Sequence, residues 1–251
     1  MNIKITNLSK NFGFNKVLKN INLRFEKGKI YGVIGDNGSG KTTLFRCIAG
    51  LEKYEGKIIS DIDSIFHGES LSGGNPENLI NLNNMETALK DYMGLLFTEP
   101  YFFPKITGRE HIRFLCNARK IDIGNIDDKN IFDLPLDDFV WTYSSGMKKK
   151  LALLALLLQN NQFILLDEPF NGLDIHSCFI VVEIIKNLRS LNKIVVISSH
   201  IFSTMSDCCD EIYLLEKGEI IKTVSPDGYV DLENEMKIFT IGNKIEKLGL
   251  K

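Results

Sequence analysis

The sequence predicts an α/β fold with a mostly parallel β-sheet, and three observations support this prediction. Short apolar runs typical of buried strands alternate with longer segments of helical pattern. A glycine-rich loop joins one of these runs to a helical segment near residue 40, and an acidic pair ends another run near residue 167. Ligands of such sheets bind beyond the carboxyl ends of the strands, so we expect the functional residues there.

Composition restricts the class of protein. The 251 residues suffice for one large domain or two closely packed lobes, and the apolar share of 44% is typical of a globular core. A net charge of −2 argues against a nucleic-acid partner bound through a basic surface. The longest apolar run, residues 151–158, is far shorter than the roughly 20 residues that span a bilayer. No apolar signal segment follows Met1, so we expect a soluble, cytoplasmic chain.

The five cysteines lack any C-x-x-C spacing, and their number is odd. A reducing compartment keeps such thiols free, so we expect buried free cysteines rather than a disulfide framework or a metal centre.

The first fifty residues lead into a loop with a recognisable pattern. Two short strands are expected at residues 3–6 and 21–25, around a turn region rich in Gly and Asn. A further buried strand is expected at residues 28–34, and a helix at residues 43–49. Between them, Gly35–Thr42 reads G-x-x-x-x-G-K-T. A plain glycine-rich turn is the alternative, but the flanking strand and helix favour a phosphate-binding loop.

The chemistry of this loop follows from its residue types. Backbone N–H groups at the start of a helix attract the α- and β-phosphates of a nucleotide. Lys41 can reach the β- and γ-phosphates, and the Thr42 hydroxyl can bind Mg²⁺. The other residues predicted to contact nucleotide are Gly35, Asn37, Gly38, Ser39, Gly40 and Thr43.

The rest of the chain continues the alternation of strands and helices. Residues 60–89 are polar and are expected mostly as surface loop, with a short helix near 85–91, and residues 121–138 are acidic and irregular. Helices are expected at residues 109–119, 145–158 and 177–191, and strands at 57–59, 163–166, 194–197, 211–216 and 219–224, the last two as a hairpin. The tail after residue 225 is too short for another domain.

Two carboxylates end the buried strand at 163–166. An unpaired carboxylate is costly inside a sheet, so Asp167 and Glu168 should emerge at the strand's end. Asp167 can hold Mg²⁺, through water, while Glu168 points elsewhere and can polarise an attacking water. A simple acidic turn is the alternative, and the phosphate loop upstream favours the catalytic interpretation.

The long apolar helix begins with serines and then lysines. Ser144 or Ser145 is a natural N-cap. Lys148, Lys149 and Lys150 in the first turns oppose the helix dipole. They either attract an anion or an acidic surface, or form a solvated basic face.

From about residue 3 to residue 224, the chain resembles the nucleotide-binding subunit of an ATP-binding-cassette (ABC) transporter. The phosphate loop, signature segment, acidic strand end, D-loop and switch histidine follow in that family's order. Residues 143–147, Tyr-Ser-Ser-Gly-Met, stand at the signature, usually Leu-Ser-Gly-Gly-Gln, so Ser144 and Gly146 are implied to meet a γ-phosphate held by the opposite protomer. The Ser-x-Gly-Met form resembles the export-type subset that pairs with a separate permease chain.

The resemblance also implies a fold and further site residues. The fold is a P-loop NTPase (RecA-like) core with an antiparallel β lobe and an α-helical lobe inserted at about residues 101–158, all within a single domain, 1–225, followed by a tail, 226–251. Residues 171–174 match the D-loop, so Asp174 is expected near the nucleotide. The other implied residues are His200, whose imidazole donates to the γ-phosphate, and Phe12, which stacks on adenine; His67, His111 and His176 are interpreted as ordinary residues.

Two features depart from the family's pattern. The glutamine of the Q-loop is replaced by Thr98, with Glu99 as an alternative substitute. The segment before it, around residues 60–90, is longer than usual and contains a signature-like stretch, residues 71–75. We reject that stretch because Pro76 follows it and no apolar helix begins there.

The implied function is ATP hydrolysis that drives transport. Two such chains close head to tail around two ATP–Mg²⁺, with Lys41, Glu168 and His200 as catalytic residues. The motion passes through the helical lobe to an integral membrane permease, which holds the chain on the cytoplasmic face of the membrane; Phe102 and Phe103 either lie on that surface or pack inside. The alternatives are a soluble ABC-type regulatory or assembly ATPase without a permease, and a small-molecule kinase.

Overall fold

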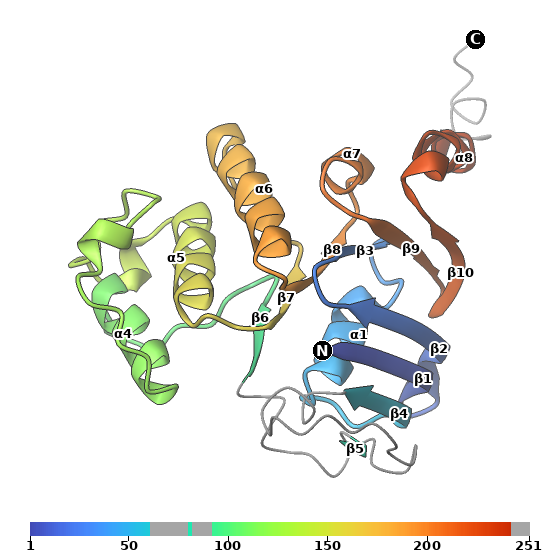
Figure 1. The fold of residues 1–251 in the computed structure, drawn as a ribbon, viewed down its shortest axis with the longest axis horizontal. Helices are drawn as coiled ribbons and strands as arrows, with labels where there is room; N and C mark the ends of the chain where they lie inside the picture. Colours follow the sequence, from blue (N-terminus) through green and yellow to red (C-terminus); the bar gives the residue numbers. More distant parts are fainter. Residues whose placement is uncertain (61–79, 82–91, 242–251) are drawn as a thin grey trace.

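The computed structural model describes residues 1–60, 80, 81 and 92–241, which form two β-sheets and the helices that cover them (Figure 1). The helix expected at 85–91, His67 and the signature-like stretch at 71–75 lie outside these residues. Among the described helices, none combines the length and apolar character needed to cross a membrane.

The smaller sheet is antiparallel and has the strand order β2-β1-β4-β5. Its strands are β1 (Asn2–Phe12), β2 (Asn15–Glu26), β4 (Glu55–Ser60) and β5 (Ile80–Asn81). The two short strands expected from the sequence are parts of one long hairpin, which turns at Gly13, with φ of 58°. The outward-facing side chains of these strands are polar, so the hydrophobic pattern did not reveal the full length of the strands.

The larger sheet has the order β10-β9-β3-β8-β7-β6 and is parallel except for β10. Its strands are β3 (Ile30–Ile34), β6 (Met93–Leu96), β7 (Phe163–Asp167), β8 (Ile194–Ser199), β9 (Glu211–Glu216) and β10 (Glu219–Val224). The sequence predicted all of these but β6, whose four residues are too short for a periodic signal.

The helices lie on both faces of this sheet and in a separate lobe (Figure 1). They are α1 (Lys41–Ile48), α4 (Gly108–Ala118), α5 (Ser145–Leu158), α6 (Ile175–Ser190), α7 (Phe202–Ser206) and α8 (Tyr229–Ile241), with 3₁₀ turns η2 (Asp127–Lys129), η3 (Val140–Thr142) and η4 (Pro226–Gly228). The sequence did not indicate α7 or α8. Tyr229 and Leu232 of α8 are buried in the same core as α7.

Two apolar cores explain the continuous apolar runs of the central strands. Phe163 and Leu165 of β7 pack with α1 and the smaller sheet, whereas Ile164 and Leu166 pack with α5, α6 and α7 on the opposite face. A strand buried on both faces carries apolar residues at every position. This burial leaves only the strand ends open to polar chemistry.

The lobe that contains α4 and α5 extends to one side of the sheet (Figure 1). Thr107 and Glu110 form a capping box that fixes the start of α4. The sequence did not decide whether Phe102 and Phe103 of this lobe lie on the surface or pack inside. Phe102 packs against the core and against the ring of His111, with centroids 4.6 Å apart. Phe103 is half exposed.

Candidate nucleotide-binding site

Four neighbouring parallel strands end at one edge of the larger sheet. The register aligns Ile34 of β3 with Ser199 of β8, and Ser198 of β8 with Asp167 of β7. The segments that follow these strands therefore lie side by side. They carry the phosphate loop, the acidic pair, His200 and, after β6, Thr98.

The phosphate loop has the conformation that its glycines allow. Gly40 is the N-cap of α1 with φ of 112°, a region that favours glycine, and it has no side chain to cover the helix N–H groups. A Cβ on Gly35 would lie 2.2 Å from the carbonyl oxygen of Leu215. The Ser39 hydroxyl is buried without a hydrogen-bond partner among the described residues. These features fit a loop built for close approach of phosphate.

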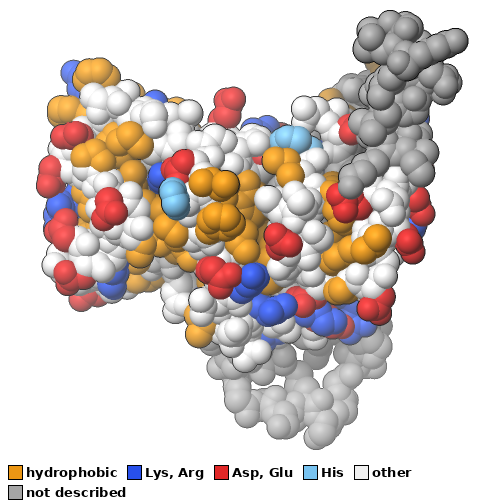
Figure 2. Space-filling view, turned by 90° about the horizontal axis from the view of Figure 1, so that it is seen from above, with side chains coloured by type: hydrophobic (Ala, Val, Ile, Leu, Met, Phe, Trp, Pro, Cys, Tyr) orange, Lys and Arg blue, Asp and Glu red, His pale blue; other side chains and the backbone are white. Residues whose placement is uncertain are grey.

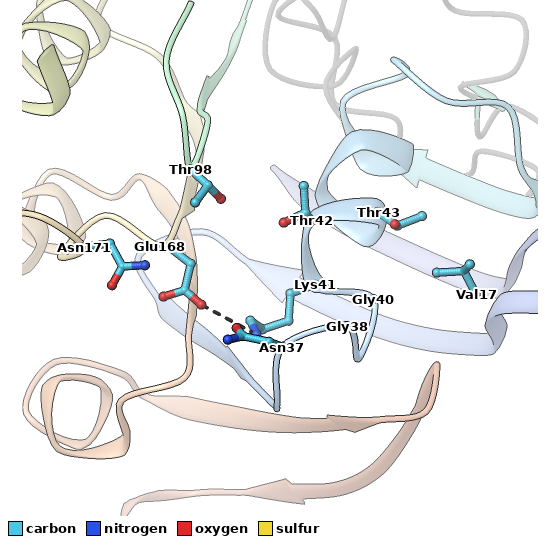
Figure 3. A pocket seen from close by; sticks show the side chains of 10 residues that line it. All are labelled: Val17, Asn37, Gly38, Gly40, Lys41, Thr42, Thr43, Thr98, Glu168 and Asn171. Carbon is cyan, nitrogen blue, oxygen red and sulfur yellow. Dashed lines mark ion pairs between the residues drawn. The ribbon is translucent and has the colours of Figure 1, made fainter. Parts of the chain in front are cut away.

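Lys41 lies across this loop. Its buried ammonium donates to the carbonyls of Gly35 at 2.7 Å and of Asp36 at 3.2 Å. The same nitrogen is 3.6 Å from a carboxylate oxygen of Glu168, which directly follows β7 (Figure 3). The cation thus lies between the loop and the acidic strand end.

Asp167 is the centre of a hydroxyl cluster. Its Oδ2 accepts hydrogen bonds from Thr42 at 2.8 Å and from Thr98 at 2.7 Å, and its Oδ1 accepts one from Ser198 at 2.5 Å. The side chain is 1% exposed, so these hydroxyls stabilise a charge that would otherwise be costly to bury. Thr98, rather than Glu99, therefore reaches the carboxylate.

Glu168 takes an unusual backbone conformation beside it. Its φ is 49°, and its N–H donates to the carbonyl and the hydroxyl of Ser198 at 3.2 Å and 3.0 Å. Residues with side chains adopt this region only where their surroundings hold them. One carboxylate oxygen faces Lys41, and the other is 3.0 Å from Nδ1 of His200.

These side chains border a cavity of about 360 Å³ (Figure 3). The phosphate loop forms one side, and Thr98, Glu168 and Asn171 face it from the strand ends. The residues that line the cavity are Val17, Asn37, Gly38, Gly40, Lys41, Thr42, Thr43, Thr98, Glu168 and Asn171. Motif spacing did not indicate Val17, which comes from the distant strand β2.

Three other predicted nucleotide contacts lie away from this cavity. Ser144 is the N-cap of α5 and accepts a hydrogen bond from Met147 N at 3.2 Å. Gly146 lies against the carbonyl of Gly172. Asp174 is the N-cap of α6, and its hydrogen bond from Lys150 holds the pKa of its carboxyl well below the usual range.

Phe12 also stands apart from the cavity lining. It ends β1 and is half exposed, and the Lys10 ammonium lies 4.5 Å from its ring centroid. That ammonium is also paired with Glu52 at 2.9 Å. The cation–π contact therefore holds the ring in place.

The donors around Asp167 fit a magnesium ion. Mg²⁺ takes carboxylate and hydroxyl oxygens and completes its shell with water and substrate phosphates. Thr42 and Asp167 provide one oxygen of each kind within hydrogen-bond distance of each other, beside the phosphate loop. In the described part of the chain, no three His, Cys, Asp or Glu side chains gather as an all-protein metal site. All five cysteines are free; four of them are buried, and Cys178 is partly exposed.

Comparison with known proteins identifies the family. The model of the family described as "ABC transporter" matches residues 18–171. The lantibiotic transport ATP-binding protein SrtF of Streptococcus pyogenes is 30% identical over 92% of this chain and 94% of its own length. The bacitracin transport ATP-binding protein BcrA of Bacillus licheniformis is 31% identical over 90% of this chain and 70% of its own. The lipopolysaccharide export system ATP-binding protein LptB of Haemophilus influenzae is 28% identical over 93% and 94%.

Solved structures agree on the fold. The ATP-binding subunit of an ABC transporter matches with a TM-score of 0.74 at 22% identity, over 95% of this chain and 94% of its own. A dimeric ATP-binding cassette in a post-hydrolysis state, bound to ADP and Pi, matches with a TM-score of 0.74 at 21% identity, over 89% and 98%. The chain therefore belongs to the ABC transporter family, in which it is an ATP-binding and ATP-hydrolysing subunit.

Proposed function

We propose that two copies of this chain close head to tail around two ATP–Mg²⁺ and drive a separate membrane permease. One observation carries the proposal: Ser144, Gly146 and Asp174 do not line the cavity that holds the phosphate loop of the same chain. The N-terminus of α5 can instead meet a γ-phosphate on the other copy, because helix N–H groups attract anions. The dimeric cassette bound to ADP and Pi, which shares this fold, supports the arrangement.

The surface beside these residues supports dimerisation. Ile175 and Phe179, one turn apart on α6, are both about two-thirds exposed next to Asp174. Apolar side chains gather over the region of α6 in the space-filling view (Figure 2). Closure of two copies would bury this apolar surface, which favours association.

The catalytic roles follow from the geometry of the cavity. Glu168 borders the cavity between Lys41 and His200, where its carboxylate can orient a water for in-line attack on the γ-phosphate. Lys41 stabilises negative charge on the β- and γ-phosphates. Nδ1 of His200 lies 3.0 Å from one oxygen of Glu168, and the imidazole N–H can donate to the γ-phosphate in place of that carboxylate when nucleotide is bound.

Magnesium would be held by Thr42 and Asp167, with Thr98 hydrogen-bonded to the same carboxylate. When bound there, it would supply Lewis-acid stabilisation of the negative charge on the phosphates. The hydroxyls of Thr98 and Ser198 orient Asp167 toward Thr42.

Export is the direction that we propose for transport. The Ser-x-Gly-Met signature at residues 144–147 resembles the export-type subset. Two of the relatives are described as lantibiotic and bacitracin transport proteins, and a third belongs to an export system. The chain would then bind the cytoplasmic face of the membrane through its permease.

The variant Glu168→Gln tests the dimer and the catalytic role together. It removes the negative charge but keeps the shape of the side chain, so we expect ATP binding to persist while hydrolysis falls by about 10² or more. The ATP-bound dimer should then accumulate. Nucleotide titration, phosphate release and light scattering in ATP–Mg²⁺ measure these three quantities.

Glu235→Gln is the matched control, because Glu235 is exposed on α8 and pairs with Lys222 of β10, and neither residue lines the cavity. It should bind and hydrolyse ATP as the wild type does. A Glu168→Gln chain that stays monomeric in saturating ATP–Mg²⁺ contradicts the dimer, and wild-type turnover by that variant contradicts the role of Glu168.

A further inference from the structure

Lys149 is a buried lysine in the first half of α5. Its residue is 3% exposed, whereas Lys148 and Lys150 on either side are partly exposed. Burial lowers the pKa of its ammonium, because a charge is costly away from water. The sequence suggested an anion-attracting or solvated lysine here, and the structure shows neither for Lys149.

The ammonium of Lys149 satisfies three backbone carbonyls. It donates to the carbonyl of Phe97 at 3.2 Å, to that of Glu168 at 3.3 Å and to that of Thr98. A lysine has three N–H donors that can point in three directions, so this one group suits three converging acceptors.

Those carbonyls belong to two separate segments of the candidate site. Phe97 and Thr98 follow β6, and the Thr98 hydroxyl donates to Asp167 at 2.7 Å. Glu168 follows β7 in the left-handed conformation described above. Lys149 is therefore a cross-link, through one cation, between α5 and both segments that border the cavity opposite the phosphate loop.

We propose that Lys149 is a positioning residue for ATP hydrolysis. Its ammonium holds the backbone of Glu168 and Thr98 at fixed positions relative to α5. The proposal rests on the role of Glu168 given under the proposed function. The start of α5 carries Ser144 and Gly146, so a shift of this helix moves both segments through Lys149. Contact of the signature segment with a nucleotide is in this way coupled to the placement of the hydrolytic carboxylate.

Lys149→Met tests this role, because it keeps an apolar stem of similar shape and removes the ammonium. We expect kcat of the full chain for ATP to fall by at least about tenfold, since small displacements of a catalytic group have large effects on rate. KM for ATP should change by less than about twofold, because the phosphate loop is untouched. The Mg²⁺ concentration for half-maximal activity should rise, because Thr98 loses its support.

Lys193→Met is the matched control. Lys193 is also buried, its pKa is also lowered by burial, and its ammonium donates to Asn160 Oδ1 at 2.6 Å and to the Asn161 carbonyl at 2.7 Å. It precedes β8 and so lies at the opposite end of the strands from the cavity. Both variants should lower the unfolding temperature, but Lys193→Met should keep wild-type kcat and Mg²⁺ dependence.

If the Lys149→Met variant does not fold, the same measurements can be made on Lys149→Gln. A glutamine amide can donate two of the three hydrogen bonds without a charge. A folded Gln variant with lowered kcat and unchanged KM supports the proposal.

Two results overturn the positioning role: wild-type kcat in a folded Lys149 variant, or an equal loss of kcat in the Lys149 and Lys193 variants. The second result would make Lys149 a stabilising residue only. A wild-type chain that binds ATP but never hydrolyses it contradicts the proposed function instead, so the two failures are distinguishable.

Discussion

A single hydroxyl group, that of Ser198, helps to orient the two carboxylates of this site. Ser198 donates its hydroxyl hydrogen to Asp167 and accepts the N–H of Glu168, so one side chain fixes adjacent residues in opposite directions. Asp167 thereby turns toward Thr42, and Glu168 turns toward Lys41 and His200. The different tasks proposed for two neighbouring acids depend on these local hydrogen bonds.

A buried histidine should make the stability of the protein depend on pH. His111 on α4 is 6% exposed, and burial lowers its pKa to about 4. The unfolded chain binds this proton near pH 6.5, so His111 contributes its full share of stability above that pH and loses it as pH falls toward 4. Between pH 7 and pH 5 the loss is about 2 kcal/mol of unfolding free energy.

Urea unfolding at the two pH values measures this loss, and His111→Phe is the comparison. Phenylalanine keeps the aromatic contact with Phe102 but cannot be protonated. The variant should lose about 2 kcal/mol less than the wild type over this interval. Equal losses in the two proteins would show that His111 does not titrate as described.

At the level of elements, the start of α5 is packed against the segment before α6. A Cβ on Gly146 would lie 2.6 Å from the backbone carbonyl oxygen of Gly172. Lys150 of α5 and Asp174, the N-cap of α6, form an ion pair at 2.6 Å. The signature segment and the D-loop thus contact each other within one chain, and α5 and α6 present their N-termini together.

Gly146→Ala should disturb this junction. The added methyl group meets backbone rather than a flexible side chain, so α5 or the D-loop must shift, at a cost of about 1–3 kcal/mol. We expect a lower unfolding free energy together with weaker ATP-dependent dimerisation, measured by urea unfolding and light scattering.

Ser145→Ala is the control for stability, because Ser145 is exposed in the same turn. It should change the unfolding free energy by no more than about 0.5 kcal/mol. If Gly146→Ala were as stable as this control, the close contact with Gly172 would not constrain the junction.

On the scale of the whole molecule, the helical lobe presents an aromatic surface near the candidate site. Tyr101, Phe103 and Phe114 are half exposed or more, and their rings contact one another at centroid distances of 6.0 Å and 5.3 Å. Tyr101 and Phe103 follow Thr98 closely in the chain. A partner bound here could therefore respond to changes around Asp167.

We predict that the chain co-purifies with a multi-span membrane protein encoded beside it. Phe103→Glu should weaken that complex by about 2 kcal/mol, roughly 30-fold, because a charge replaces an aromatic contact. Ile221→Glu on β10, also half exposed, is the control and should leave the complex intact. Recovery of the chain in an active form without any membrane protein would favour the soluble regulatory ATPase.

Much of this molecule could be predicted from short stretches of sequence. The phosphate loop, the hairpin of β9 and β10, and α5 have the predicted bounds or nearly so, because glycine conformations, apolar periodicity and N-caps act over a few residues. The strands β7 and β8 were evident because burial on both faces makes them apolar throughout. The missing elements, β5, β6, α7 and α8, are short or gain their stability from tertiary contacts.

The sequence alone determined which residues we predict to carry phosphate and acid chemistry, since each motif is contiguous. Only the tertiary structure decided which distant side chains contact these motifs. The Thr98 hydroxyl donates to Asp167, the Lys149 ammonium donates to the carbonyl of Glu168, and Val17 lines the cavity. These contacts join residues that are separate in sequence, by 19 positions for Lys149 and Glu168 and by 69 for Thr98 and Asp167, so their distances depend on how the strands align and the helices pack. Burial likewise changed Lys149 from an apparent surface charge into an internal donor, because only packing determines access to water.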